Sequence, residues 1–175
     1  RLANLAREYC IEDLVFEPSA QVVDVGAHSG EFGLWLEQFE VSYLGIEPDP
    51  VAHGALARNL PNSSLEPVAL GAKAGHARFS LATSTGDSSL EVGAGKSITV
   101  QVKTLDEVAA LAFPEGTIAV LKIEAEGFEP EVLQGGAKTL ARTELVTVDA
   151  GEERSGHSTA PACVNLLLGC GFQLR

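Results

Sequence analysis

The chain has 175 residues, of which 45% are apolar, and a net charge of −12. This length and apolar content predict one packed domain spanning residues 1–175, not a disordered chain. Proteins that grip the phosphates of DNA or RNA need clustered lysines and arginines, whereas the 12 basic residues of this chain are scattered. We therefore expect no binding to nucleic acid and no binding to an anionic membrane surface.

Several features indicate the setting in which the protein works. No apolar run approaches the roughly 20 residues that span a bilayer, and no signal peptide is visible. The three cysteines, Cys10, Cys163 and Cys170, are odd in number and form no C-x-x-C. They are therefore predicted to be buried thiols in a reducing compartment, not a disulfide framework or a zinc site, and the protein to be cytoplasmic. Because the sequence starts at Arg1 without Met, we expect it to be trimmed at one or both ends.

Hydrophobic periodicity predicts helices that alternate with strands along the whole chain. The expected helices cover residues 1–13, 31–38, 50–60, 105–112, 130–140 and 165–168. The expected strands cover 21–25, 43–46, 64–70, 117–123 and 144–148, and a further strand begins at Phe172. This order predicts an α/β fold of the Rossmann-like type, with a mostly parallel sheet and helices on both faces.

Two segments depart from this alternation. Period-two patterns at residues 77–81 and 98–102 predict a small antiparallel excursion around 75–103. The Ser/Gly-rich residues 83–95 between them are either a lid over an acceptor or an idle loop. Thr104 and Glu107 have the spacing of a capping box, which predicts the start of a helix.

A glycine-containing turn, residues 24–30, follows the first strand and has the pattern D-x-G-x-x-x-G. A dinucleotide fold needs the middle glycine of G-x-G-x-x-G at the position of His28, because the pyrophosphate sits against bare backbone there. A nicotinamide oxidoreductase is therefore disfavoured. The spacing resembles the first motif of class I S-adenosylmethionine (SAM) methyltransferases, although Gly26 and Gly30 could serve only to make a tight turn.

Glu47 ends the second strand, seventeen residues after Gly30. An acid in this place can accept hydrogen bonds from ribose hydroxyls. Ligands of parallel sheets bind at the carboxyl ends of the strands, so one site is expected to gather the residues that follow each strand. These are residues 24–30, Glu47, Ala69 and Leu70, residues 124–127, and Asp149.

A second motif, residues 121–129, reads L-K-I-E-A-E-G-F-E and is followed by V-L-Q-G-G-A. Together with residues 23–27, 45–48, 69–71 and 102–106, it resembles the FkbM family of class I methyltransferases, in which the stretch reads approximately K-I-D-x-E-G-x-E. The likeness runs from about residue 22 to 149 in the family's order. Glu124 stands where the family usually has Asp, which places the carboxylate one methylene farther out.

The resemblance implies a SAM-dependent methyltransferase, usually one that acts on an oxygen of a sugar, glycoside or other small-molecule or polysaccharide acceptor. By analogy, Asp24 either contacts the SAM ammonium or caps the turn, Glu47 holds the ribose diol, and Asp49 either borders adenine or caps a helix. Backbone groups of Ala69 and Leu70 are expected at the adenine edge. The full set of cofactor-binding candidates is Asp24, Gly26, Ala27, His28, Ser29, Gly30, Glu47, Pro48, Ala69 and Leu70.

Methyl transfer to a hydroxyl requires alignment of the reactants and removal of a proton. The candidates for the base are Glu124 and Glu126, and Lys122 could orient one of them or stabilise an alkoxide. Alternatively, Lys122 and Glu126 form an ion pair that only shapes the site. His157 is a further candidate for the base or an acceptor contact, and a direct catalytic role for His28 is less favoured.

Three questions stay open at this level. The acids Glu124, Glu126 and Asp149 could also hold Mg²⁺. N-methylation is the nearest alternative to O-methylation, and a degenerate SAM-binding module without methyl transfer is an alternative from another class. The sequence carries no indication of the oligomeric state.

Overall fold

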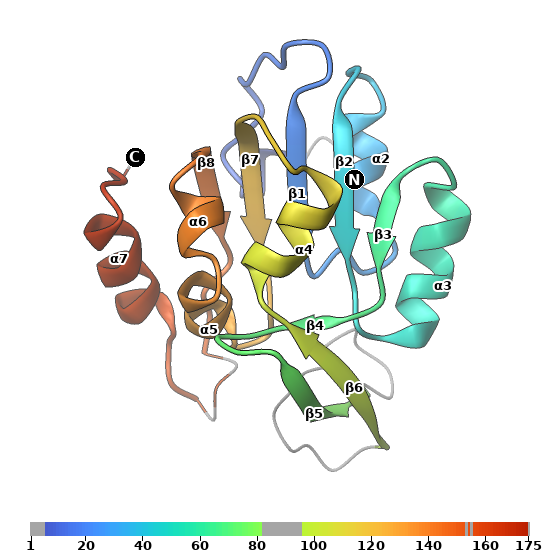
Figure 1. The fold of residues 1–175 in the computed structure, drawn as a ribbon, viewed down its shortest axis with the longest axis vertical. Coiled ribbons are helices and arrows are strands. Elements are labelled where there is room, and N and C mark those ends of the chain that lie inside the picture. Colours follow the sequence, from blue (N-terminus) through green and yellow to red (C-terminus); the bar gives the residue numbers. More distant parts are fainter. Residues whose placement is uncertain (1–5, 82–95, 153, 155, 175) are drawn as a thin grey trace.

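The computed structural model describes residues 6–81, 96–152, 154 and 156–174. A five-stranded parallel sheet forms its centre, in the order β3-β2-β1-β7-β8 (Figure 1). The strands are β1 (Gln21–Val25), β2 (Ser42–Ile46), β3 (Ser64–Glu66), β7 (Ile118–Ile123) and β8 (Thr143–Val148). The strand order reverses between β1 and β7, so the carboxyl ends of these two strands are where a ligand of such a sheet is expected.

Helices cover both faces of this sheet, as the sequence predicted. They are α2 (Glu31–Leu36), α3 (Pro50–Asn59), α4 (Leu105–Ala112), α5 (Glu129–Gln134), α6 (Ala137–Leu140) and α7 (Ala160–Gly169). Successive side chains of a strand point to opposite faces. Val23 and Val25 of β1 therefore pack with α4 to α7, whereas Val22 packs with α2, α3 and the N-terminal residues Ala6 and Ile11.

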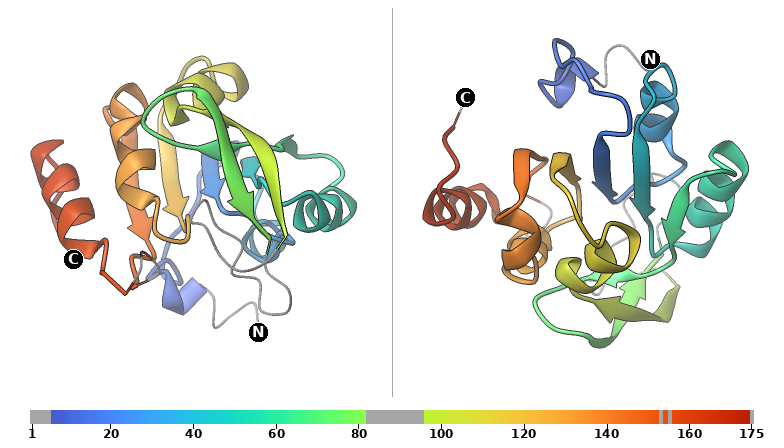
Figure 2. Two further views of the ribbon diagram at one scale, coloured as in Figure 1. Left: turned by 90° about the horizontal axis from the view of Figure 1, so that it is seen from below. Right: turned by 45° about the horizontal axis from the view of Figure 1, so that its top comes forward.

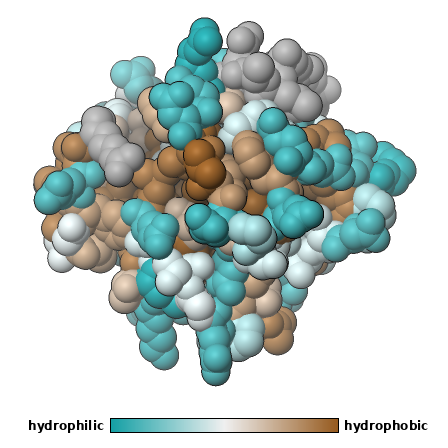
Figure 3. Space-filling model, turned by 90° about the horizontal axis from the view of Figure 1, so that it is seen from above, coloured by the Kyte–Doolittle hydropathy of each residue, from teal (hydrophilic) through white to brown (hydrophobic). Residues whose placement is uncertain are grey.

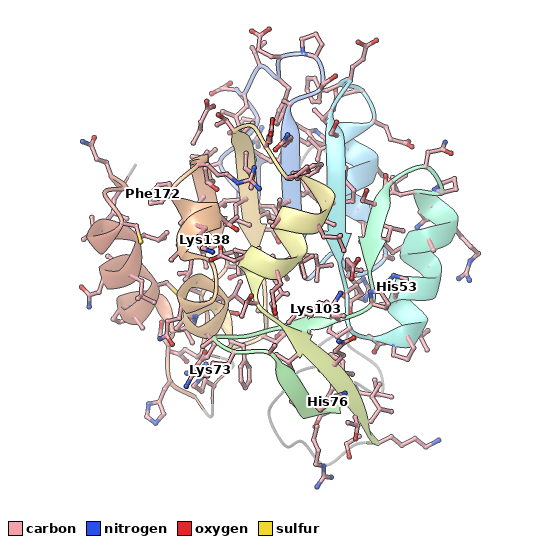
Figure 4. The ribbon with its side chains drawn as sticks, viewed as in Figure 1. His53, Lys73, His76, Lys103, Lys138 and Phe172 are labelled. Carbon is pink, nitrogen blue, oxygen red and sulfur yellow. The ribbon has the colours of Figure 1, made fainter. Side chains whose placement is uncertain are left out.

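A three-stranded sheet, in the order β4-β6-β5, lies across the end of the large sheet at which its strands finish (Figures 1 and 2). It consists of β4 (Ala69–Leu70), β5 (Gly75–Ser80) and β6 (Ser97–Lys103), and β5 and β6 are antiparallel. The antiparallel excursion is therefore confirmed, while the Ser/Gly-rich residues 83–95 lie outside the described residues. Lys103, labelled in Figure 4, links the two sheets because its Nζ lies 2.9 Å from Glu66 Oε2.

Two predicted elements are divided in the structure. The single strand expected over 64–70 is wrong: β3 ends at Glu66, and Ala69 and Leu70 pair with β6. Pro67 lies between them and has no N–H with which to continue the first ladder. The helix expected over 130–140 is divided at Gly135 and Gly136, and a Cβ at Gly135 would lie only 2.3 Å from the Gly71 carbonyl oxygen.

The two ends of the chain also differ from expectation. Of the helix expected over 1–13, residues 6–8 are helical within the described part, and Cys10 then takes a positive φ of 54°. The prediction of buried thiols holds for Cys163 but is wrong for Cys10 and Cys170, which are exposed. Phe172 does not begin a strand: it follows α7, and its ring packs against the core between the sheet and α4 to α7 (Figure 4).

The end of the molecule opposite the small sheet has an uneven distribution of apolar and hydrophilic side chains. Seen from above, apolar side chains gather near its centre and hydrophilic ones lie around its rim (Figure 3). Within the described residues, none of the helices combines the length and the apolar character needed to traverse a bilayer.

Candidate active site

The turn after β1 brings three strand ends together. Gly26 and Gly30 have φ values of 73° and 92°, and His28 also has a positive φ, of 48°. A Cβ at Gly26 would lie 1.8 Å from the backbone oxygen of Glu124, so only glycine lets the segments after β1 and β7 touch. The amides of Gly26 and Ala27 both donate to Ile46 O, at the end of β2.

Glu47, directly after β2, is fixed against this turn. Its Oε2 accepts a hydrogen bond from the His28 amide at 2.9 Å, and its Oε1 accepts one from the Asp49 amide at 2.7 Å. The residue is only 6% exposed, and burial raises the pKa of its carboxyl although these two amide bonds oppose the shift. Each carboxylate oxygen keeps a further acceptor position. Glu47 therefore has the acceptor positions that a pair of adjacent hydroxyls requires, and its contact with a ribose diol stays a prediction.

Residues near Glu47 make hydrogen bonds at the starts of the helices α3 and α2. Asp49 caps α3, because its Oδ1 accepts hydrogen bonds from the amides of Val51 and Ala52. The helix-cap alternative for Asp49 is thus confirmed. Ser29 Oγ donates to Glu31 Oε2 at the start of α2.

Lys122 of β7 is the centre of a buried ionic network. Its ammonium lies 3.1 Å from Asp24 Oδ1 and 2.9 Å from Glu124 Oε2, and it donates a hydrogen bond of 2.8 Å to Gly26 O. Burial alone would lower the pKa of Lys122, but the charges of Asp24 and Glu124 raise it above its ordinary value. The lysine is therefore a fixed cation that joins the glycine turn to Glu124, and its ion pairs are with Asp24 and Glu124, not the predicted Glu126.

Asp24 faces the interior of the protein. Its side chain is fully buried, and Oδ2 accepts a hydrogen bond of 2.6 Å from the Tyr43 hydroxyl. Oδ1 accepts no hydrogen bond, but the positive charge of the Lys122 ammonium lies close to it and compensates its negative charge. The structure thus leaves Asp24 no exposed oxygen for a SAM ammonium.

Glu124, in contrast, reaches the surface. Its side chain is 38% exposed, and Oε2 takes the Lys122 ammonium and a hydrogen bond from the Tyr9 hydroxyl. Burial would raise the pKa of Glu124, but the charge of Lys122 and the hydrogen bonds from Tyr9 and Lys122 lower it below its ordinary value. A further electrostatic contribution from His28 acts to lower the pKa of both Glu124 and Glu47.

The loop after Glu124 is held by a residue that the sequence reasoning missed. Glu129 is 1% exposed, and its Oε1 accepts hydrogen bonds from the amides of Ala125 and Gly127, at 3.0 and 2.9 Å. Its Oε2 accepts one of 2.7 Å from the Thr159 hydroxyl. Glu126 takes a positive φ of 50° in this loop. The final acid of E-G-x-E was the available signal for Glu129.

Asp149 and His157 follow the edge strand β8. The Asp149 amide donates to Ile123 O at 2.9 Å, and burial with the charges of Glu124 and Glu129 raises the pKa of its carboxyl. His157 is exposed, and its amide donates to Arg154 O. Arg154 in turn lies over the Phe128 ring and pairs with Glu131. This turn is adjacent to the loop of Glu126, but a catalytic role for His157 stays a prediction.

Two further expectations concern adenine and a metal ion. Ala69 and Leu70 are buried in β4, which pairs along one side with Val102 and Lys103 of β6, and a contact of their backbone with adenine stays a prediction. Among the described residues, no group of three or more His, Cys, Asp or Glu side chains is placed to hold a metal ion. The structure therefore gives no support for Mg²⁺.

Comparison with known proteins agrees with this arrangement. A TehB-like SAM-dependent methyltransferase from Corynebacterium glutamicum has a similar structure, with a TM-score of 0.50 and 11% identity over 99% of this chain and 82% of that chain. This likeness shows the fold, that of a class I methyltransferase. No curated protein gives a significant match. The family model described as the methyltransferase FkbM domain matches residues 24–174, and the chain therefore belongs to the FkbM family of SAM-dependent methyltransferases.

Proposed function

We propose that the protein transfers a methyl group from SAM to a hydroxyl oxygen of a sugar, glycoside or other small-molecule or polysaccharide acceptor. The observation that carries this proposal is Glu124, a partly exposed carboxylate that is kept ionised by its lowered pKa and whose Oε2 is held by Lys122 and Tyr9. A hydroxyl acceptor must lose its proton, whereas a neutral amine can attack without prior deprotonation. A fixed ionised carboxylate therefore favours oxygen as the acceptor atom.

The cofactor side of the proposal relies on Glu47 and the turn at residues 26–30. Glu47 would hold the ribose diol with its two remaining acceptor positions, and Pro48 would border the adenine. The amide of His28 keeps the Glu47 carboxylate in place. SAM, when bound, supplies a methyl group on a positively charged sulfur, which is already activated for displacement.

The acceptor side relies on Glu124, with Glu126 beside it in the same loop. Glu124 would take the proton of the acceptor hydroxyl, so that the oxygen's electron pair can bond the methyl carbon as the carbon–sulfur bond breaks. Lys122 and Tyr9 hold the carboxylate for this step. Lys122 is only 3% exposed, and its ammonium is already bound by partners within the protein. We therefore propose that it positions Glu124 and does not stabilise an alkoxide directly.

The test begins with titration calorimetry of the purified protein with SAM and with its demethylated product. Binding in the micromolar range would justify a screen of sugars and glycosides with SAM carrying a labelled methyl group. NMR of the product then separates O-methylation from N-methylation. Binding without transfer to any acceptor would favour the degenerate module, and a folded protein that binds neither compound would overturn the proposal.

A further inference from the structure

Residues 6–16 deliver a side chain to the candidate active site although they precede the region matched by the family model. Ala6 and Ile11 of this segment are buried in the core formed with α2 and α3. Between them, the Tyr9 ring lies 6.2 Å from the Phe32 ring, and the Thr147 hydroxyl of β8 donates a hydrogen bond of 3.1 Å to Tyr9 O. Tyr9 is therefore fixed from both its backbone and its ring.

The hydroxyl of Tyr9 contacts Glu124, the proposed base. It donates a hydrogen bond of 2.5 Å to Glu124 Oε2, and the Lys122 ammonium lies 5.4 Å from the centre of the Tyr9 ring. Both partners of the Glu124 carboxylate in the described residues thus share one oxygen, Oε2. The other oxygen, Oε1, is left for a ligand.

We infer that Tyr9 is a positioning residue for methyl transfer, whose hydroxyl fixes Glu124 so that Oε1 can accept the acceptor proton. This inference rests on the proposed function. It also means that the site of this chain is incomplete without its N-terminal segment, which supplies a hydrogen-bond donor from outside residues 24–174.

The electrostatics agree with this role. Burial raises the pKa of the Tyr9 hydroxyl above its ordinary value, so Tyr9 stays protonated and remains a donor. The groups that act on Glu124 are Lys122 from the preceding strand β7, Tyr9 from the N-terminal segment and His28 from the glycine turn, and Glu124 in turn acts on Asp149, which follows β8. Of these, Tyr9 is the neutral donor, so Tyr9→Phe removes a hydrogen bond and no charge.

The experiment is an NMR pH titration of protein labelled with ¹³C at the glutamate carboxyl carbons, in which Glu124→Gln identifies the Glu124 signal. In Tyr9→Phe, which keeps the ring and its packing, we expect the Glu124 titration to move to higher pH. The matched control is Tyr43→Phe, which removes the hydroxyl that bonds Asp24. Tyr43→Phe should leave the pH at which Glu124 titrates unchanged. If that pH is also unchanged in Tyr9→Phe, the inference is overturned.

A second measurement covers the case in which Tyr9→Phe does not fold. The chain has two tyrosines, so ¹³C labelling of the tyrosine Cζ gives two signals. Glu124→Gln should lower the pH at which the Tyr9 signal titrates, although burial still keeps it above its ordinary range, while the titration of Tyr43 is unchanged. A Tyr9 titration that Glu124→Gln does not change would contradict a bond between the two side chains.

Activity supplies the last readout. With an acceptor from the screen above, we expect Tyr9→Phe to lower kcat about ten-fold or more, to move the acidic limb of the rate profile to higher pH, and to leave SAM affinity unchanged. An unchanged kcat would overturn the positioning role. Failure of the wild-type protein to bind SAM would remove the proposed function, yet both NMR readouts would still report on the Tyr9–Glu124 bond.

Discussion

Lys122 and Asp24 are partners on neighbouring strands, and the Lys122 ammonium lies 3.1 Å from Asp24 Oδ1 with neither side chain more than 4% exposed. Buried charges are tolerated only when they are paired and hydrogen-bonded. Here the cation also reaches Gly26 O and Glu124, so one lysine joins the turn that would face the cofactor to the carboxylate that would face the acceptor.

Lys122→Met should therefore strongly destabilise the fold. Methionine matches the length of the lysine stem but leaves the buried Asp24 without a counter-charge. We expect the free energy of unfolding to fall by about 3–5 kcal/mol, as for other broken buried ion pairs. Urea unfolding measures this loss. Lys138→Met, at an exposed position on α6 (Figure 4), is the control and should change stability by less than about 0.5 kcal/mol.

Asp24→Asn separates a structural role from a cofactor contact. The substitution removes the charge that faces Lys122, so we expect lower stability. Because both Asp24 oxygens are buried and compensated by Tyr43 and Lys122, SAM affinity should stay within about three-fold of wild type, or roughly 0.7 kcal/mol. Calorimetry on the folded variant decides the matter, and a loss of affinity of a hundred-fold or more would restore the ammonium contact.

The sequence predicted most of the fold because the strands of a covered parallel sheet are apolar runs with clear turn residues between them. The spacing of Gly26 and Glu47 also placed these residues correctly at neighbouring strand ends, and the hydrogen bond from the His28 amide of the glycine turn to Glu47 agrees with a shared site. Thr104 and Glu107 form the capping box that their spacing indicated.

The incorrect and missing predictions have physical causes that the pattern of the linear sequence does not reveal. Pro67 lies inside an apolar run, and its missing N–H lets Ala69 and Leu70 join another sheet. The side-chain direction of Asp24 depends on Tyr43, two residues before its register partner Gly45 on β2. Tyr9 is 115 residues from Glu124 in sequence, so only folding brings the two together.

Glu129→Ala tests the support of the loop that carries Glu126. The substitution leaves the amides of Ala125 and Gly127 without their acceptor, at a cost of about 1–3 kcal/mol for the buried Gly127 amide and less for the partly buried Ala125 amide. We expect lower thermal stability and slower turnover with little change in SAM affinity. Glu129→Gln keeps one acceptor oxygen for both amides and should recover most of the stability. Equal losses in the two variants would contradict this role.

Glu126→Gln asks whether the loop also supplies chemistry. If Glu126 takes part in proton transfer, turnover should fall about a hundred-fold while SAM affinity is unchanged, because general bases contribute on that scale. Glu131→Gln, on the adjacent helix α5 and paired with Arg154, is the comparison for a simple change of local charge. Similar rates for wild type and Glu126→Gln would leave Glu124 as the proposed base.

Glu47→Ala should weaken SAM binding by about 1–3 kcal/mol, since a charge-assisted hydrogen bond to the ribose diol would be lost. Asp49→Asn is the matched control, because asparagine can still cap α3 through its side-chain oxygen. We expect that variant to bind SAM nearly as well as wild type. Calorimetry that found wild-type affinity in Glu47→Ala would remove the ribose role.

The raised pKa of the Glu47 carboxyl also leads to a prediction of how SAM affinity depends on pH. Burial raises the pKa of its carboxyl in the free folded protein, so this group favours folding below its unfolded pKa of about 4.5, and that contribution is lost as pH rises through the raised folded pKa. A ribose diol that donates to the carboxylate prefers the ionised form, so binding should lower this pKa and release a proton at acidic pH. Affinity is therefore expected to be greatest above the folded pKa of Glu47 and to weaken as pH falls through it. Calorimetry with the demethylated product, in two buffers of different ionisation enthalpy, measures the proton release directly. Glu47→Gln cannot ionise and should show weaker binding without this release, whereas identical release in both proteins would assign the proton to another group.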